Sequence, residues 1–168
     1  MKRLNKVAAI AAALLTGIIF TQATAFAQIG RDPQTNARHS RIVGLWDVEV
    51  AVANCANGAP LTSFLALHKY ELGGTGQVVP NGSSTALSAH MMIWNHVSGN
   101  DYQMSVKMFR FGEAGDPIGW IVLNSAVSIN EAADEYAGSG VAEFFDADGN
   151  FLFASCPSFV GTRFTGEP

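Results

Sequence analysis

Basic residues are scarce in this chain, and their scarcity excludes one large class of partners. The 168 residues include 10 Lys and Arg against 14 Asp and Glu, a formal net charge of −4. Three of the basic residues, Lys2, Arg3 and Lys6, stand at the N-terminus, so seven remain for the rest of the chain. A nucleic-acid surface needs a clustered basic patch. We therefore expect no nucleic-acid partner.

Long apolar runs are also missing beyond the N-terminus, so we expect no membrane span. The run at residues 7–20 is 14 residues long, shorter than the roughly 20 that a transmembrane helix needs. It follows the three N-terminal cations and precedes alanines on both sides of Phe26, which is the layout of a secretory signal peptide. The sequence predicts a signal peptide at residues 1–27, cleavage after Ala27, and a secreted or periplasmic protein of 141 residues.

Cysteine occurs only twice, as Cys55 and Cys156. Disulfides persist in the compartments that exported proteins reach, and two cysteines allow a single intramolecular pairing. No histidine or further cysteine stands near either one at the spacing of metal ligands. Two free buried thiols are the alternative. We expect a disulfide, which would close a loop of roughly 100 residues.

Helical periodicity is absent after the predicted signal peptide, where apolar and polar side chains alternate instead. Residues 28–40 are polar and are expected to form a flexible N-terminal arm. From residue 41 onward apolar side chains recur at every second position, the pattern of half-buried β-strands, and Gly, Asn, Asp and Pro clusters separate the runs. The sequence predicts one domain at residues 41–168 with eight strands, at about 42–52, 62–72, 75–79, 90–97, 102–111, 118–129, 135–145 and 151–164.

Eight short strands at this spacing predict an antiparallel meander, which could be an open sheet, a sandwich or a closed barrel. Closure would remove the exposed edges. Paired residue numbers in an antiparallel ladder have a constant sum. Trp46 with Arg163, a candidate cation–π pair, gives 209, and Cys55 with Cys156 gives 211. Both pairings place the first strand beside the last, so we expect an all-β, eight-stranded antiparallel up-and-down β-barrel.

Several motifs resemble a known family. Gly44-Leu45-Trp46 with Arg163 resembles the Gly-x-Trp motif and C-terminal Arg of lipocalins, in which the Arg packs over the Trp at the closed end of the barrel. The wider pattern is similar to uncharacterised secreted bacterial proteins of lipocalin-like (calycin-type) fold. Its other elements are Cys55 with residues 58–61, Gly73-Gly74-Thr75, Trp94, residues 109–111, residues 145–150, Cys156 and residues 161–163. This resemblance, over about residues 41–164, implies a fold and no defined activity.

The interior of an eight-stranded barrel is filled by side chains or holds one small ligand. We place the candidate pocket on residues of inward register, with His68 or Tyr70 as a polar anchor and Trp94 and the methionines as adaptable walls. The candidate pocket residues are Val48, Val50, His68, Tyr70, Met92, Trp94, Met104 and Met108.

Two features of this pocket depend on backbone geometry. A three-residue loop at residues 99–101 would pair Trp94 with Val106 and Met92 with Met108, whereas a two-residue loop would place Trp94 beside Ser105. We expect the first, because it separates polar from apolar side chains better. Gly138 and Gly140 indicate either cavity space or a bend in their strand.

Other signals of chemistry are weak. His39, His68, His90 and His96 are not at recognised ligand spacing, so no metal is expected. Asp146-x-Asp148-Gly149-Asn150 resembles part of a calcium loop but is expected to be a hairpin turn. Nucleophile-elbow, zinc-protease, P-loop and dinucleotide motifs are absent, so we predict no catalytic residue and no cofactor.

Three hypotheses of function remain at this stage. The first is an exported module that binds a small hydrophobic ligand in the barrel. The second is a barrel-type cyclase or isomerase acting on a lipid-like substrate, although a protein without enzymatic activity is favoured. The third is a structural or interaction protein with a filled core. The sequence determines neither the ligand nor the oligomeric state.

Overall fold

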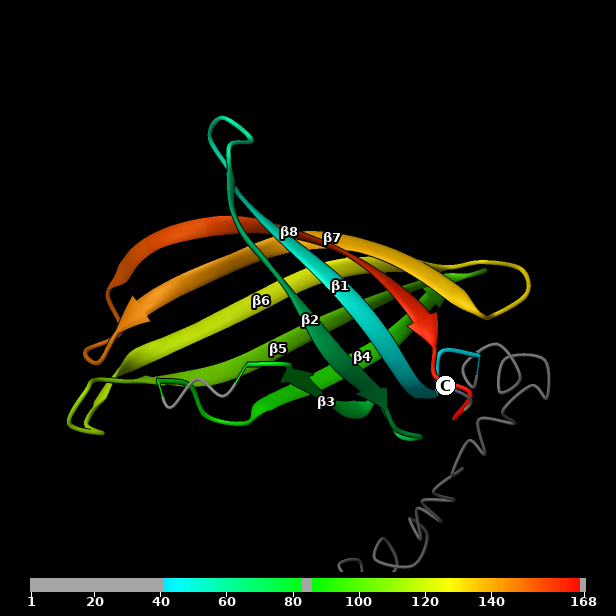
Figure 1. Ribbon diagram of the computed structural model, residues 1–168, viewed down its shortest axis with the longest axis horizontal. Coiled ribbons are helices and arrows are strands. Elements are labelled where there is room, and N and C mark those ends of the chain that lie inside the picture. The colour runs from blue at the N-terminus through cyan, green and yellow to red at the C-terminus, as the bar shows by residue number, and fades with distance from the viewer. Residues whose placement is uncertain (1–40, 83–85, 167–168) are drawn as a thin grey trace, which may run out of the picture. The chain divides into compact units, whose positions relative to one another are not determined.

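A computed structural model of the chain describes residues 41–82 and 86–166. These residues form a closed barrel in which eight strands follow one another in sequence order (Figure 1). The strands are β1 (Gly44–Asn54), β2 (Pro60–Tyr70), β3 (Thr75–Pro80), β4 (His90–Ser98), β5 (Asp101–Phe111), β6 (Pro117–Ile129), β7 (Glu135–Asp146) and β8 (Phe151–Arg163). The predicted all-β, antiparallel up-and-down barrel is confirmed. The predicted signal peptide and N-terminal arm lie outside the described residues.

Alternation along each strand produces the barrel wall. In β1, Trp46, Val48 and Val50 are buried, whereas Asp47 and Glu49 between them are exposed. Such a period of two places apolar side chains inside and polar ones in solvent. The strand ends agree with the predicted ones within two residues. Among the described residues, no helix is long and apolar enough to cross a membrane.

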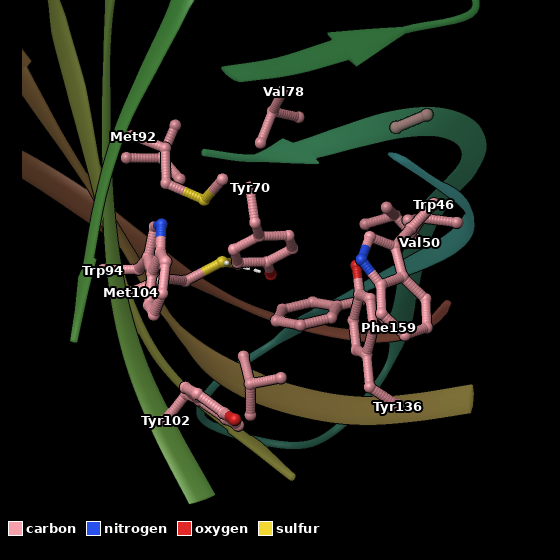
Figure 2. Packing of buried hydrophobic residues seen from close by; sticks show 14 of the residues in the cluster. Trp46, Val50, Tyr70, Val78, Met92, Trp94, Tyr102, Met104, Tyr136 and Phe159 are labelled. Carbon is pink, nitrogen blue, oxygen red and sulfur yellow. Dashed lines mark hydrogen bonds between the residues drawn. The ribbon is translucent and has the colours of Figure 1, made fainter. Parts of the chain in front are cut away.

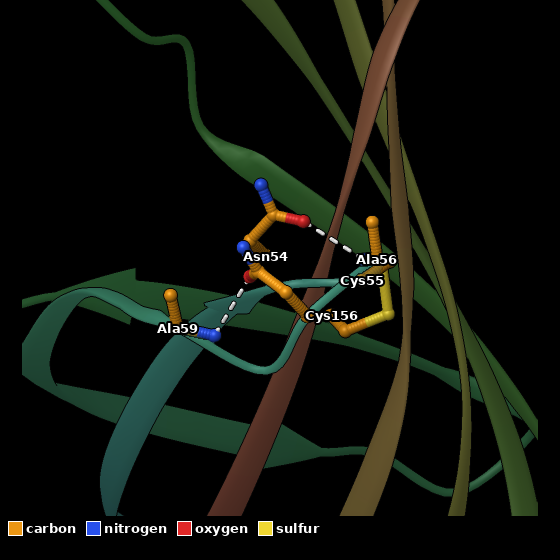
Figure 3. The surroundings of a disulfide bond; sticks show 6 residues. Asn54, Cys55, Ala56, Ala59 and Cys156 are labelled. Atoms are coloured by element: carbon orange, nitrogen blue, oxygen red, sulfur yellow. Dashed lines mark hydrogen bonds between the residues drawn. A yellow bond between two sulfur atoms is a disulfide. The ribbon is translucent and has the colours of Figure 1, made fainter.

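The first and last strands close the barrel. β1 pairs with β8 from Trp46 opposite Arg163 to Asn54 opposite Ser155, and Figure 1 shows β1 beside β8. Cys55 follows the last residue of β1, and its disulfide to Cys156 joins Cα atoms 5.0 Å apart (Figure 3). Because Cys55 lies beyond the ladder, its pairing differs by two residues from that of Trp46. The predicted disulfide is present.

The predicted register of the β4–β5 hairpin is wrong by two residues, and the predicted three-residue loop is wrong as well. Met92 lies opposite Val106, and Trp94 lies opposite Met104. The turn has two residues, with Gly99 at a φ of 52°, and the register shifts between His96 and Ser98. The shorter turn and this bulge each shift the register by one residue, so together they preserve the predicted parity and move each partner by two residues.

Glycines in β7 and β8 make room for aromatic rings. A Cβ atom on Gly138 would lie 2.2 Å from the ring of Phe159, and one on Gly161 would lie 2.3 Å from the ring of Tyr136. A Cβ atom on Gly140 would lie 2.2 Å from the carbonyl oxygen of Asn124. Close approach of rings and backbone, rather than cavity space, therefore accounts for the low bulk of this face.

Replacing Gly161 by alanine is expected to destabilise the barrel by about 1–3 kcal/mol, the usual cost of overpacking a filled interior. Gly82→Ala is the matched control, since nothing lies within 4 Å of its Cβ position, and it should change stability by less than about 0.5 kcal/mol. Urea unfolding of both variants would measure the difference. Equal midpoints would contradict the close packing against Tyr136.

Candidate functional site

All eight predicted pocket residues face the interior of the barrel and are at most 9% exposed. They come from β1, β2, β4 and β5, and the seven that are not histidine belong to one continuous hydrophobic cluster. Their neighbours are mostly other side chains: the Tyr70 hydroxyl donates a hydrogen bond to the Met104 sulfur, 3.3 Å away. The structure thus brings the predicted residues together inside a packed half of the barrel.

Aromatic rings fill that half. We call them the aromatic floor, which consists of Trp46, Tyr70, Trp94, Tyr102, Tyr136 and Phe159 (Figure 2). The rings of Trp46 and Tyr136 lie edge to face at 4.9 Å, and those of Trp94 and Tyr102 at 5.9 Å, the geometry that aromatic pairs prefer. Three of these rings, Tyr102, Tyr136 and Phe159, were not among the residues predicted from the sequence, although strand parity could have found Tyr102.

Two arginines close the floor from outside. The guanidinium of Arg163 lies 4.2 Å from the Trp46 ring centroid and donates hydrogen bonds to the carbonyls of Ala133, Val43 and Arg41. The Arg41 side chain in turn donates to the Asn100 side chain and to the carbonyls of residues 130 and 131. This end of the barrel is therefore sealed by a network that joins its entering chain and its loops.

A buried polar pair stands on the floor. The Tyr136 hydroxyl lies 2.7 Å from His68 Nδ1, and both residues are 2% exposed. Burial, together with the nearby His90, lowers the pKa of His68 to about 4. Burial raises the pKa of Tyr136. Tyr136 therefore stays protonated, and its hydroxyl donates a hydrogen bond to Nδ1 of a neutral imidazole, so the pair is uncharged at neutral pH.

This pair predicts that the protein loses stability in acid. The folded-state pKa of His68 is about 4 against 6.5 when unperturbed, so the unfolded chain binds the extra proton between these values. The contribution of neutral His68 to the free energy of unfolding is fully present above about pH 6.5. It decreases by about 3 kcal/mol as the pH drops to 4. His68→Asn, which keeps an acceptor for Tyr136, should flatten the curve by this amount in urea titrations at several pH values. An unchanged slope would contradict a neutral buried imidazole.

Toward the opposite end of the barrel, some inward-facing side chains are exposed. Along β2 the inward-facing side chains become more exposed, from Tyr70 at 1% to Phe64 at 36%. Along β8 the exposed fraction rises from 3% at Phe159 to 50% at Phe153. We call this region the open half and define it by the partly exposed inward-facing residues at that end. They are Val52, Phe64, Leu123, Phe144 and Phe153.

Two hollows border the wall of the barrel. One, of about 570 Å³, has mostly outward-facing side chains on its border, among them Leu65 and Val160, and we place it on the outer face of β1, β2, β7 and β8. The other, of about 440 Å³, lies beside the β3–β4 connection and reaches the inward-facing His90. Of the eight predicted pocket residues, only Val50 borders either hollow.

The buried polar side chains of the described residues are His68, His90, Ser125 and Ser155. The Ser125 hydroxyl has no hydrogen-bond partner within that part of the chain. It faces inward on β6, opposite Met104 on one side and Gly140 on the other. His90 also faces inward, and burial lowers its pKa. Uncharged polar groups thus lie between the aromatic floor and the open half.

Two further sequence signals can be placed. The Asp146 carboxylate accepts hydrogen bonds from the backbone of Asp148 and from the backbone and side chain of Asn150. It therefore serves the predicted hairpin turn between β7 and β8. Within residues 41–82 and 86–166, no group of three or more His, Cys, Asp or Glu is placed to hold a metal. His39 lies outside the described residues.

Comparison with known proteins shows no family for this chain. No protein-family model matches the chain, and no curated protein matches it by sequence. Among solved structures, the chain is similar to Rv2717c from M. tuberculosis, with 12% identity, a TM-score of 0.39, and coverage of 79% of this chain and 98% of that one. The identification of an eight-stranded antiparallel barrel rests on the strand pairing itself.

Proposed function

We propose that this is an exported protein that binds one small hydrophobic molecule in the open half of its barrel. The observation that carries the proposal is the contrast between the two halves. Inward-facing side chains are packed at the aromatic floor, whereas Phe64 and Phe153, also of inward register, are 36% and 50% exposed. Apolar surface inside a concave wall gains about 25 cal/mol for each Å² that a ligand covers.

The packed half of the barrel restricts where a ligand can enter and how deep it can bind. The aromatic floor and the Arg163 network seal one end, so a ligand would enter from the other end or beside His90. The predicted pocket residues then form the base of the site rather than its walls, with Val50 and Met108 nearest to the open half. The disulfide supports export, since such bonds persist in oxidising compartments.

Titration of the purified protein with the neutral dye N-phenylnaphthylamine tests the proposal. We expect a saturable rise in dye fluorescence. Ala142→Phe, which adds bulk on the inner face of β7, should weaken dye binding by about tenfold, the equivalent of 1.4 kcal/mol. Val141→Phe is the matched control, because Val141 is the adjacent residue of outward register, and it should leave dye binding unchanged.

The Phe153→Ala variant provides a second arm, since this half-exposed ring can be truncated without opening the packed core. We expect weaker dye binding with an unchanged melting temperature. Absence of saturable fluorescence, or the same loss of binding in the Val141 and Ala142 variants, would overturn the proposal.

An interaction protein is the second candidate, and an outer aromatic row favours it. Phe109, Trp120, Phe145 and Phe151 pair in that order across β5 to β8, and Phe109 and Phe151 are about half exposed. Exposed apolar patches of this kind often mark interfaces. Sedimentation of wild-type and Phe151→Glu protein would test it: association that the variant abolishes would favour this function. The cyclase or isomerase alternative stays a prediction from the sequence.

A further inference from the structure

One arginine stands at the rim of the open half. Arg110 follows Met108 in the inward register of β5 and lies opposite Gly119 of β6. Gly119 has no side chain that could face Arg110 at this position. The Arg110 guanidinium lies 5.8 Å from the centroid of the Phe144 ring, which stacks on Phe153 at 4.2 Å. The guanidinium is thus held over an aromatic platform.

This guanidinium has no anionic partner in the described part of the chain. Arg163 and Arg41 each donate three hydrogen bonds. By contrast, no carboxylate of the described residues lies within 4.0 Å of the Arg110 guanidinium. Among these residues the ion pair within that distance joins Lys69 and Glu71. Arginine carries five N–H donors in a fork that matches a carboxylate. A half-buried cation without a carboxylate, in a chain with an excess of acidic residues, favours binding of an external anion.

We propose that Arg110 binds the carboxylate head group of a single-chain amphiphile whose apolar tail occupies the open half. This inference rests on the proposed function and names its ligand class. The tail would cover the partly exposed inward side chains, while the head would stay at the rim. A carboxylate placed deeper would lose hydration beside uncharged groups such as His68 and Ser125, which is costly without a paired cation.

Lys107 provides a matched control. It lies on the same strand in outward register, with its ammonium 5.5 Å from the Phe109 ring centroid and 5.2 Å from that of Trp120. Lys107 and Arg110 are therefore both cations over aromatic rings, but on opposite faces of the wall. Only Arg110 is on the side of the open half.

Calorimetric titration with octanoate and octanol separates the head group from the tail. We expect both to bind wild-type protein, with octanoate the tighter. Arg110→Gln should weaken octanoate by about tenfold and leave octanol unchanged. Arg110→Lys should retain part of the octanoate affinity, and Lys107→Gln should alter neither ligand.

The outcomes distinguish this inference from the proposed function. If neither octanoate nor octanol binds wild-type protein, the proposed function fails, and this inference with it. If both bind and Arg110→Gln leaves octanoate unchanged, only the role of Arg110 is overturned. Equal losses of octanoate and octanol in Arg110→Gln would show that the side chain supports the tail site, which also overturns recognition of the head group.

Discussion

Removal of the Cys55–Cys156 disulfide is expected to lower the free energy of unfolding by as much as about 5 kcal/mol. The two cysteines are 101 residues apart in the chain, so the bond restricts a large part of the unfolded ensemble. It also fastens the tip of the β1–β2 hairpin to β8, beyond the last backbone pair at Asn54. The Cys55→Ser/Cys156→Ser double variant, unfolded in urea, measures the loss.

Reduction of the wild-type protein serves as the control for this prediction. Reduced wild-type protein and the double variant should unfold at the same urea concentration, because both lack the same constraint. Addition of reductant to the double variant should change nothing. Equal stability of oxidised and reduced wild-type protein would contradict a stabilising bond.

Replacement of Arg163 by methionine is expected to cost about 3–4 kcal/mol, from lost hydrogen bonds to charge and a lost cation–π contact. Three carbonyl oxygens would lose their donor, namely those of Ala133, Val43 and Arg41. The Trp46 ring would lose its cover at the sealed end of the barrel. The expected result is a large shift of the urea midpoint at nearly constant slope.

Arg163→Lys separates the two contributions. Lysine keeps a cation near Trp46 but lacks the planar guanidinium that reaches three carbonyls at once. About half of the loss in free energy of unfolding should therefore remain. The tryptophan fluorescence spectrum, to which Trp46 contributes as one of three tryptophans, should shift to the red in the methionine variant, since water would reach the Trp46 indole. A loss below about 1 kcal/mol for methionine would show that the Arg163 network does not stabilise the closed end.

Much of the fold could be predicted because period-two alternation is a local property. Trp46, Val48 and Val50 share one parity, and this fixes which side of β1 is buried. The candidate pairing of Trp46 with Arg163 further predicted that the first and last strands close the barrel. The bulge between His96 and Ser98 could not be predicted, because its one-residue insertion leaves no mark in the hydrophobic pattern.

The site was less predictable than the fold. Parity correctly placed Tyr70 and Met104 inside, but which rings fill one half depends on packing between strands far apart in the sequence. Tyr136 reaches His68 across the barrel because Gly161 leaves room beside its ring. The rim was missed altogether, since Arg110 and Phe144 meet only once β5, β6 and β7 are assembled.

The most direct measurement is a crystal structure of the protein grown with ω-bromooctanoate, in which anomalous scattering locates the bromine. Binding in the open half predicts a bromine peak inside the barrel, between Val50 and Leu123, with the carboxylate at the rim. A bromine peak only in the outer groove beside Leu65 and Val160, or no peak at saturating ligand, would contradict binding in the open half.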